Sequence, residues 1–558
     1  MIRELHAVLR SFTKAEAAFF ILALALAAFS SVSLGIITFL EKTESIAIAG
    51  GVYREGIVGQ PTFINPVLEG SNEVDHDLIK LLFADTTELK ERIAVSKNGT
   101  VWNIRLKENI LWDDGEPITS DDFIFTLRAI QDPDVRSPRA PLFEGVDASR
   151  VSEREFSLTL RAPYAFFEET IGNLKPIPKH IFGALPAPNL SLSEFNLEPI
   201  GSGPYRVEKM EKRRDGFIAE YRLRRNDRYA GKKPYLDMIV IKFFQREDDG
   251  IAAMNASAID GIGGVGAANL PRITTNHETT EFHLPRYYAV FLNPYAEPVL
   301  TDKNVRRAMD EAIAPDRLIG EVLDNHGLAV HGPLFPGMSG YSPNPRSAAR
   351  NIDTANEILE RTGWKRGDNG IREKISETGT GKNKETKMNR LEFTLVTPDI
   401  PFLVKTAEFI RGEWEKAGIK ITIDAQSLLD IEERALKTRN YDMVLFGHIL
   451  PSADLYSLWH SSEKFYPGLN LALYDNKTAD AFLESIRKNF NEANRANDLE
   501  SFESLIENDV PAIFLYSPSY LYIQKPSFEG FADRVLKTPA DRFSNIEEWY
   551  VKTARVFK

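Results

Sequence analysis

The stretch "VWNIRLKENILWDDGEPITSDDFIFTLRAI", residues 101–130, joins an alternating segment, an acidic turn and a run of helical character. Trp102, Ile104 and Leu106 alternate with polar residues, which is typical of a half-buried strand. Behind the acidic residues, Phe123 opens an apolar stripe at helical spacing. The stretch therefore predicts a strand, a tight turn and a helix in close succession.

The acidic residues of this stretch raise the question of a metal site. An EF-hand calcium loop needs acids on alternate positions and a glycine at the sixth, and Asp113-Asp114-Gly115 breaks that spacing. Asp-Gly instead favours a tight turn. Thr119, with Asp122 three positions later, predicts a capping box, and Asp121 then lies in the first helical turn, where the helix dipole favours negative charge. We therefore predict a structural turn and cap, with no metal and no cofactor.

Length and composition narrow the function classes. The chain has 558 residues, which suits two or three domains, and a formal net charge of -12 from 68 Lys and Arg against 80 Asp and Glu. No basic cluster offsets this charge, so nucleic acid is not an expected partner. Cysteine is absent, which excludes disulfides, thiolate metal sites, a cysteine nucleophile and a lipid-modified cysteine anchor.

Motifs for catalysis are lacking. "GIGGVG" (261–266) fits G-x-G-x-x-G, but the residues before it look helical and those after it start a long helix poorly, so a flexible backbone near a ligand or a plain turn is favoured over a dinucleotide site. The nine histidines are scattered, and "GSGPY" (201–205) has its serine in the wrong register for a nucleophile elbow. Asp75-His76-Asp77 is interpreted as a solvated helix start. We predict that the protein is not an enzyme.

The amino terminus predicts a membrane segment. Ala17 to Leu40 carries no charge over 24 residues, and as a helix it would span about 36 Å, enough for a hydrocarbon core of about 30 Å. Arg3, Arg10 and Lys14 precede it, which places the N-terminus in the cytoplasm and the remainder outside. The favoured interpretation is an uncleaved anchor spanning 15–40 behind a cytoplasmic segment 1–14. The alternatives are a cleaved signal sequence that leaves a secreted or periplasmic protein, and a helix buried in the fold.

Strands and helices alternate through the exported part. "DMIVIKFF" (237–244) suits a strand buried on both faces. In 301–319 the apolar residues follow helical spacing up to Pro315, and in 398–423 a helical stripe is closed by Gly418 and followed by an alternating strand. Such units predict an α/β architecture. The polar, glycine-rich segment 365–389 is expected to form an exposed hairpin or mobile loop.

The chain resembles the peptide-type extracellular solute-binding proteins of ABC transporters, the oligopeptide- and dipeptide-binding family. The quoted stretch 101–130 is similar to the family's signature of a strand, an aromatic-x-Asp-Gly turn and an acidic helix start. Further elements follow in the family's order: "GSGPYRVE" (201–208), "RRNDRYAGKKPYLDMIVIKF" (224–243), "AMNASAIDG" (253–261), "FLNPYAEPVLTDKNVRRAMDEAIAPDRLI" (291–319), "ANEILERTGW" (355–364) and "VPAIFLYSPSY" (510–520). The resemblance spans roughly residues 46–550.

This resemblance implies a periplasmic-binding-protein-like (type II) clamshell of two lobes with an extra subdomain, preceded here by one transmembrane helix. The chain is expected to cross between the lobes more than once. We assign 46–75, 200–282 and 505–558 to lobe I, 76–199 to the extra subdomain, and 283–504 to lobe II.

Site residues are carried over from the positions of the family's motifs. Many relatives hold the free amine of a peptide with a carboxylate before an Asp-Pro or Glu-Pro pair, in a segment that resembles "YDMVLFGHILPSADLYSLWHSS" (441–462). Here Pro451 stands at that position, so either Asp454 substitutes or the ligand lacks a free amine. The other expected cleft residues are Phe446, His448, Trp459, Tyr288, Ile262, Gly263, Gly264, Gly59 and Gln60, for which a core position is the alternative.

The function implied by the resemblance is capture of peptides between closing lobes and delivery to the permease and ATPase subunits of an ABC importer. The chain is expected to act as a monomer, tethered to the cell membrane by its N-terminal helix. Alternatives are binding of another solute, such as an oligosaccharide, an opine-like compound, haem or chelated nickel, or a membrane-tethered sensor or chaperone without transport.

Overall fold

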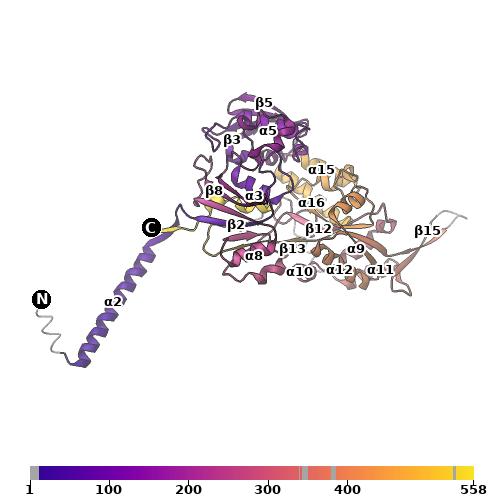
Figure 1. The fold of residues 1–558 in the computed structure, drawn as a ribbon. Coiled ribbons are helices and arrows are strands. Elements are labelled where there is room, and N and C mark those ends of the chain that lie inside the picture. Colours follow the sequence, from indigo (N-terminus) through magenta and orange to yellow (C-terminus); the bar gives the residue numbers. More distant parts are fainter. Residues whose placement is uncertain (1–11, 339, 342–349, 379–384, 532–535, 558) are drawn as a thin grey trace.

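The computed structural model describes residues 12–338, 340–341, 350–378, 385–531 and 536–557. Its described part contains a globular body built on two mixed sheets, and a long helix, α2 (Lys14–Lys42), that extends away from this body (Figure 1). A two-stranded ribbon of β1 (Thr43–Ala47) and β22 (Thr553–Phe557) joins α2 to the body.

Lobe I is built on a seven-stranded sheet in the order β11-β21-β10-β2-β9-β8-β7. In this spatial order its strands are Glu278–Phe282, Tyr520–Gln524, Gly261–Gly263, Val52–Val58, Met238–Phe244, Ile218–Arg225 and Tyr205–Lys212. Strands β10, β2 and β9 run parallel, and the outer strands pair antiparallel. In β9 the side chains of Ile239, Val240, Ile241 and Phe243 are buried, as the apolar run predicts for a strand covered on both faces. Helices α3 (Glu73–Leu82) and α8 (Glu247–Asn255) pack against this sheet (Figure 1).

The extra subdomain carries a four-stranded antiparallel sheet in the order β3-β4-β6-β5. Its strands are Lys90–Val95, Val101–Leu106, Glu155–Thr159 and Asp147–Ser152, and its helices are α4 (Thr86–Leu89), α5 (Ser120–Gln131), α6 (Phe167–Gly172) and α7 (Lys179–Phe182). The subdomain shares one continuous hydrophobic core with lobe I, including Trp102 of β4 and Tyr221 of β8.

The stretch that opened the sequence analysis folds as predicted. Trp102, Ile104 and Leu106 are buried while their neighbours in β4 are half-exposed. At the start of α5, Thr119 accepts a hydrogen bond from the Asp121 N–H at 3.3 Å, and Asp122 accepts one from the Thr119 N–H at 2.8 Å. The prediction of a turn and a capping box is therefore confirmed.

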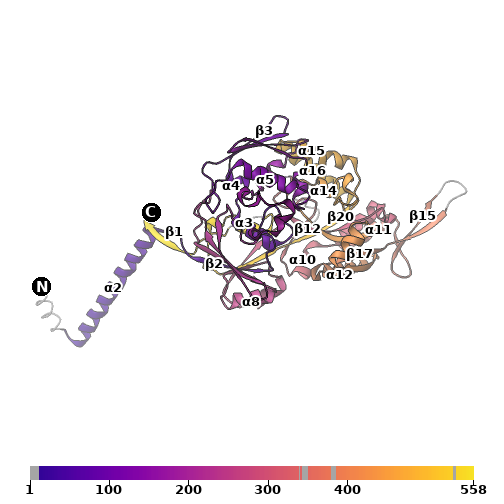
Figure 2. The ribbon, with the colours of Figure 1, turned by 45° about the horizontal axis from the view of Figure 1, so that its top comes forward.

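Lobe II is built on a six-stranded mixed sheet in the order β13-β20-β12-β19-β17-β18. Its strands are Gly327–Ala329, Ala512–Pro518, Arg286–Leu292, Met443–Ile449, Glu392–Pro398 and Lys420–Gln426. Its helices are α9 (Lys303–Glu311), α10 (Pro315–Leu323), α11 (Ile352–Arg361), α12 (Pro401–Lys416), α13 (Leu428–Asp430), α14 (Tyr456–Trp459), α15 (Lys477–Lys488) and α16 (Glu492–Asp509). Side chains of β12 alternate between two cores, with Val290 on one face and Phe291 on the other, so helices cover both faces of the sheet (Figure 2).

A hairpin projects from lobe II at the end of the body opposite α2 (Figures 1 and 2). It consists of β15 (Arg372–Thr378) and β16 (Glu385–Arg390), with β14 (Lys365–Arg366) beside it. The expectation of a hairpin in 365–389 is confirmed for these strands, while residues 379–384 lie outside the described part.

The chain passes between the two large sheets at two neighbouring places. Residues 283–285 lead from β11 in lobe I to β12 in lobe II, and Ser519 alone separates β20 in lobe II from β21 in lobe I. The Ser517 hydroxyl donates to the Leu284 carbonyl at 3.1 Å and ties the two crossings together. The observed return of the chain to lobe I lies later than the expected boundary at residue 505, because α16 and β20 belong with lobe II. Only the residues from Ser519 onward return to lobe I.

Candidate functional site

A cavity of about 220 Å³ lies at the carboxyl ends of the parallel strands β2 and β10. This lobe I cavity is lined by Gly56, Ile57, Val58, Glu73, Val74, Asp77, Glu247, Gly263, Gly264, Tyr520, Pro539 and Arg542. In open α/β sheets, ligands bind outside the carboxyl ends of the strands, where the loops diverge. The position of the cavity is therefore the one that the sheet topology favours for a ligand.

One wall of the cavity is formed by a buried ionic cluster around Arg542. The Arg542 guanidinium donates to both carboxylate oxygens of Asp77 at 2.6 and 2.7 Å, and to Glu55 Oε1 at 3.0 and 3.2 Å. Glu55 also accepts from the hydroxyl of Tyr522 at 2.7 Å. Burial raises the pKa of Glu55, although Arg542 and Tyr522 act in the opposite direction. With two carboxylates on one guanidinium, the Arg542 cluster is negative when both acids are ionised.

The cavity wall carries more carboxylates than guanidinium groups. Glu73, Asp77 and Glu247 face one lining guanidinium, that of Arg542. Glu247 also accepts from the Gly266 N–H at 2.9 Å and so fixes the loop after β10. A negative wall favours a ligand that brings a positively charged or hydrogen-bond-donating group.

The glycines of "GIGGVG" are required by tyrosine hydroxyls on neighbouring strands. A Cβ added to Gly261 would lie 1.9 Å from Tyr53 Oη, and one added to Gly263 would lie 1.9 Å from Tyr520 Oη. These contacts are far closer than a Cβ tolerates, so a larger residue would have to displace the tyrosine. The motif lies in a strand followed by a short 3-10 turn, which agrees with the interpretation against a dinucleotide site.

Of the expected site residues that lie in lobe I, Gly263 and Gly264 line the lobe I cavity. Ile262 is fully buried in a separate apolar cluster behind β10. Gln60 exchanges two hydrogen bonds with the backbone of Ile218, at 2.8 and 2.9 Å, and fixes the loop after β2 on β8. Gly59, with a φ of +122°, makes the turn that allows this contact.

Asp454 joins lobe II to the extra subdomain. Its Oδ2 accepts from Arg487 Nε at 2.9 Å and from the Tyr164 hydroxyl at 2.9 Å, and only 10% of its side chain is exposed. The Arg487 guanidinium lies over the rings of both Tyr164 and Tyr456. In this conformation the carboxylate of Asp454 is thus hydrogen-bonded to side chains of the protein itself.

The remaining expected residues lie in or beside the sheet of lobe II. His448 is buried, its Nδ1 is 3.0 Å from the Tyr287 hydroxyl, and burial lowers its pKa to about 3, so the ring is neutral. Trp459 is 1% exposed and belongs to the same core, and Phe446 packs half-buried against it. Tyr288 is half-buried, with its ring 5.3 Å from that of Phe402. The structure thus places His448 and Trp459 among core side chains and apart from the lobe I cavity.

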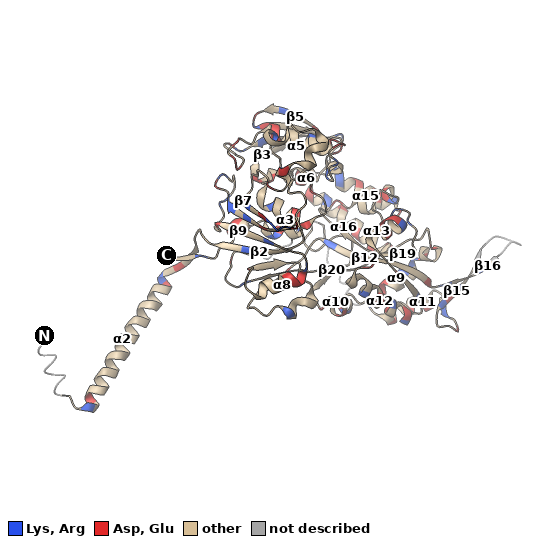
Figure 3. Ribbon diagram, viewed as in Figure 1, with Lys and Arg blue, Asp and Glu red and all other residues tan. Residues whose placement is uncertain are grey.

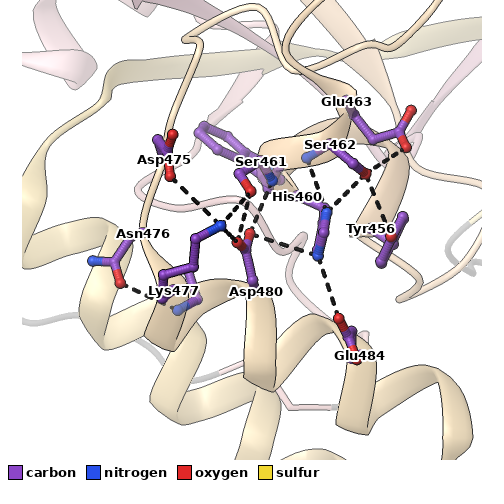
Figure 4. Close-up of polar contacts among 12 residues, drawn as sticks. Tyr456, His460, Ser461, Ser462, Glu463, Asp475, Asn476, Lys477, Asp480 and Glu484 are labelled. Carbon is purple, nitrogen blue, oxygen red and sulfur yellow. Dashed lines mark hydrogen bonds and ion pairs between the residues drawn. The ribbon is translucent and has the colours of Figure 1, made fainter.

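The loop that follows Asp454 is fixed on α15 by a polar cluster (Figure 4). The Ser461 hydroxyl and N–H donate to Asp480 at 2.6 and 2.9 Å, and His460 Nδ1 lies 2.8 Å from the Ser462 hydroxyl. His460 Nε2 is 3.7 Å from Asp480 and 3.8 Å from Glu484. The two hydrogen bonds from Ser461 to Asp480 tie the loop to α15, which is the geometry of a structural anchor.

Sequence reasoning missed the Arg542 cluster. The Asp75-His76-Asp77 trio was expected to be a solvated helix start, which is wrong for both acids. Asp75 is 2% exposed and accepts from the Thr62 N–H at 2.7 Å, and Asp77 is 4% exposed and binds Arg542. Asp77 and Glu55 lie 465 and 487 residues before Arg542, so the sequence gives no local signal of this cluster.

Comparisons with known proteins agree with this fold. The profile of bacterial extracellular solute-binding proteins, family 5 (middle region), matches residues 86–465, more than half of the chain. The oligopeptide-binding protein AppA of Bacillus subtilis is 25% identical over 532 residues, which cover 90% of this chain and 92% of AppA. Its solved structure in complex with a nonapeptide gives a TM-score of 0.67 at 24% identity, covering 91% of this chain and 100% of AppA.

Two further solved structures show the same fold at lower identity. The ABC transporter substrate binding protein CtaP of Listeria monocytogenes gives a TM-score of 0.75 at 20% identity, covering 90% of this chain and 99% of CtaP. NikZ of Campylobacter jejuni in complex with Ni(L-His) gives 0.66 at 22% identity, covering 89% and 99%. These similarities confirm the predicted clamshell of the type II periplasmic-binding-protein class. The chain belongs to the bacterial extracellular solute-binding proteins, family 5.

Proposed function

We propose that this chain captures peptides outside the cytoplasmic membrane and delivers them to the permease of an ABC importer. The observation that carries the proposal is the lobe I cavity, an acidic recess at the carboxyl ends of β2 and β10 in a molecule of two lobes. Family 5 proteins are solute-binding components of ABC importers, most of which bind peptides and some of which bind nickel.

The acidic wall suits the free amine of a peptide. A buried ammonium group needs a carboxylate partner, because desolvation of an unpaired charge is costly. Asp454 already binds Arg487 and Tyr164, so it does not offer a free carboxylate in this conformation. Glu73 on the cavity wall is the carboxylate that would take its place, because both carboxylate oxygens of Asp77 already bind Arg542.

Capture would proceed by closure of the lobes about the two crossing segments. The crossings at 283–285 and Ser519 lie side by side, so a small change in their backbone angles moves one large sheet relative to the other. A ligand drives this closure only to the extent that it binds the closed state more tightly than the open state. The closed form, held near the bilayer by α2, would then dock on the permease.

The proposal is tested by the ligand-induced rise in melting temperature and by calorimetry of the full-length chain with di- to nonapeptides. Each peptide is used with a free and with an acetylated N-terminus. A ligand at 100 times its Kd adds about 2.7 kcal/mol of stability, which gives a clear shift. We expect free peptides to raise the melting temperature, and Glu73→Gln to weaken free peptides more than acetylated ones.

Glu278→Gln serves as the matched control, because Glu278 is an exposed acid of lobe I in β11, outside the cavity. If no peptide pool shifts the melting temperature while a metal chelate or an oligosaccharide does, the peptide assignment is wrong. If acetylated and free peptides bind equally well, the role of the acidic wall is wrong and the peptide assignment stands.

A further inference from the structure

The C-terminal strand lies directly against the end of the predicted membrane helix. β1 begins at Thr43, immediately after α2 ends at Lys42, and pairs antiparallel with β22 from Thr43↔Phe557 to Ala47↔Thr553. Figures 1 and 2 show the C-terminus beside the junction of α2 and β1. We call this pair of strands the juxtamembrane ribbon.

The ribbon is bonded to the helix as well as to itself. The Thr43 hydroxyl donates to the Phe39 carbonyl at 2.5 Å, within the last turn of α2, and accepts from the Arg555 guanidinium at 3.0 Å. The ring of Phe557 lies 6.2 Å from that of Phe39 in an edge-to-face arrangement. The last described residue of the chain is therefore at the level of the outer end of the helix.

That level corresponds to a membrane–water interface. None of the residues of α2 is buried, and Figure 3 shows charged residues only near its two ends. The uncharged run from Ala17 to Leu40 is long enough to span a hydrocarbon core of about 30 Å. Phe39 then lies at the outer boundary of the core, and Phe557 lies beside it with 75% of its surface exposed.

The ribbon also lacks the burial that a pair of strands needs in water. Two isolated strands are only marginally stable unless an apolar face is covered. Here Ile46 and Val556 are more than a third exposed in addition to Phe557. Charges of both signs lie beside them, from Lys42 and Arg555 and from Glu41 and Glu44. Exposed apolar side chains next to charged ones are typical of segments that lie in a lipid interface.

We propose that the end of the juxtamembrane ribbon next to α2 contacts the outer surface of a lipid bilayer, with the Phe557 side chain inserted at the level of the lipid headgroups. The chain is then held at the membrane by α2 and by β22, and only the four residues 48–51 separate β1 from strand β2 of lobe I. Five strand pairs span about 16 Å, so the lobes stand at a short, fixed distance from the membrane. This inference rests on α2 being an uncleaved anchor and is independent of which solute the lobes bind.

The experiment uses the full-length chain reconstituted in phosphatidylcholine vesicles whose acyl chains are brominated, which quench nearby tryptophan. Phe557→Trp places the probe at the interface. Ile375→Trp is the matched control, because Ile375 is 62% exposed on the hairpin at the opposite end of the molecule. The unsubstituted chain supplies the background of six tryptophans, all of them buried.

We expect the added emission of Phe557→Trp to be blue-shifted and at least halved in brominated vesicles, and that of Ile375→Trp to be unchanged. A second measurement needs no variant: in unbrominated vesicles, every second amide hydrogen of Thr553–Phe557, those bonded to β1, should exchange at least tenfold more slowly than in an unstructured peptide.

Unquenched emission at position 557 in a chain that resists carbonate extraction would overturn the inference, as would unprotected amides in β22. Release of the chain by carbonate, with a new N-terminus beyond α2, would overturn it together with the anchor. Peptide-induced stabilisation measured on the same vesicles reports on the proposed solute capture separately.

Discussion

Arg542 is the side chain whose loss should affect stability most. It is 3% exposed, and its guanidinium makes two contacts with Asp77 and two with Glu55, both of which are buried acids. Arg542→Met keeps most of the aliphatic volume and removes the charge, which leaves two carboxylates uncompensated in the core of lobe I. Breaking a buried ion pair in this way costs about 3–5 kcal/mol.

The cost should depend on pH. Burial already raises the pKa of Glu55 above its unfolded value of about 4, and without Arg542 this pKa rises further, because the largest opposing influence is lost. The folded variant therefore binds more protons than the unfolded chain above pH 4, and its free energy of unfolding falls as pH rises through this window. We expect the deficit relative to the unmodified protein to be at least about 1 kcal/mol larger at pH 8 than at pH 5.

Urea denaturation of the ligand-free chain, followed by tertiary fluorescence at pH 5 and pH 8, measures both effects. Arg154→Met is the matched control, because Arg154 also bridges two glutamates, Glu108 at 2.6 Å and Glu91 at 3.2 Å, but at the surface. Exposed pairs contribute at most about 1 kcal/mol. If Arg542→Met loses no more stability than Arg154→Met, or loses the same amount at both pH values, the buried cluster does not stabilise lobe I as argued.

Three further predictions concern local features. Asp122→Ala should cost about 1–2 kcal/mol and Asp121→Ala less than about 0.5 kcal/mol in urea denaturation, because the Asp122 carboxylate accepts from two backbone N–H groups at 2.8 and 2.9 Å; equal losses would contradict this. Gly263→Ala should cost about 1–3 kcal/mol through its clash with Tyr520, and adding Tyr520→Phe should recover only part of it in a double-mutant cycle, because the ring Cζ would still lie 2.8 Å from the new Cβ. Burial raises the pKa of Asp113 to about 6, so the folded state holds a proton that the unfolded chain releases near pH 4, and stability falls as pH rises between these values. The free energy of unfolding of Asp113→Asn, relative to that of the unmodified protein, should therefore rise by roughly 1–3 kcal/mol from pH 4 to pH 8. If the free energies of unfolding of the two proteins change in parallel with pH, this prediction is wrong.

Local features of the fold could be predicted because their causes lie within a few residues. The alternation in β4 depends on the two-residue period of a strand, and the cap of α5 depends on Thr119 and Asp122 three positions apart. The same holds for the buried run of β9. Short-range patterns of this kind determine which element forms, but they do not determine its partners.

The boundary between the lobes shows where such reasoning ends. β20 and β21 are both buried apolar strands and are separated by one residue, Ser519, yet they belong to different sheets. Their assignment depends on pairing with β12 and with β10 and β11, which are more than 200 residues away. Both strands have the same apolar pattern, so the sequence does not show that they belong to different sheets. The predicted boundary at 505 therefore lies before the observed one at Ser519.

Residues of the candidate site could be predicted only where the residue type itself indicates an unusual backbone or a close contact. Gly263 and Gly264 stood out because a glycine-rich run needs a reason, and the tyrosine hydroxyls and the cavity provide it. Glu55, Asp77 and Arg542 carry no such sign. Their shared function arises because the C-terminal segment returns to lobe I and places a guanidinium between two acids from its first hundred residues.

The position of Asp454 bears on how the ligand's charge is met. A carboxylate held by both Arg487 and the Tyr164 hydroxyl must lose two charge-assisted contacts before it can accept an ammonium group. The Tyr164 contact also joins lobe II to the extra subdomain, so releasing it would loosen the body at the moment when closure should tighten it. Glu73 has no comparable role between lobes, because it lies on the first turn of α3 at the cavity wall. The extra subdomain and lobe II can therefore stay joined while the ligand's amine is neutralised from lobe I.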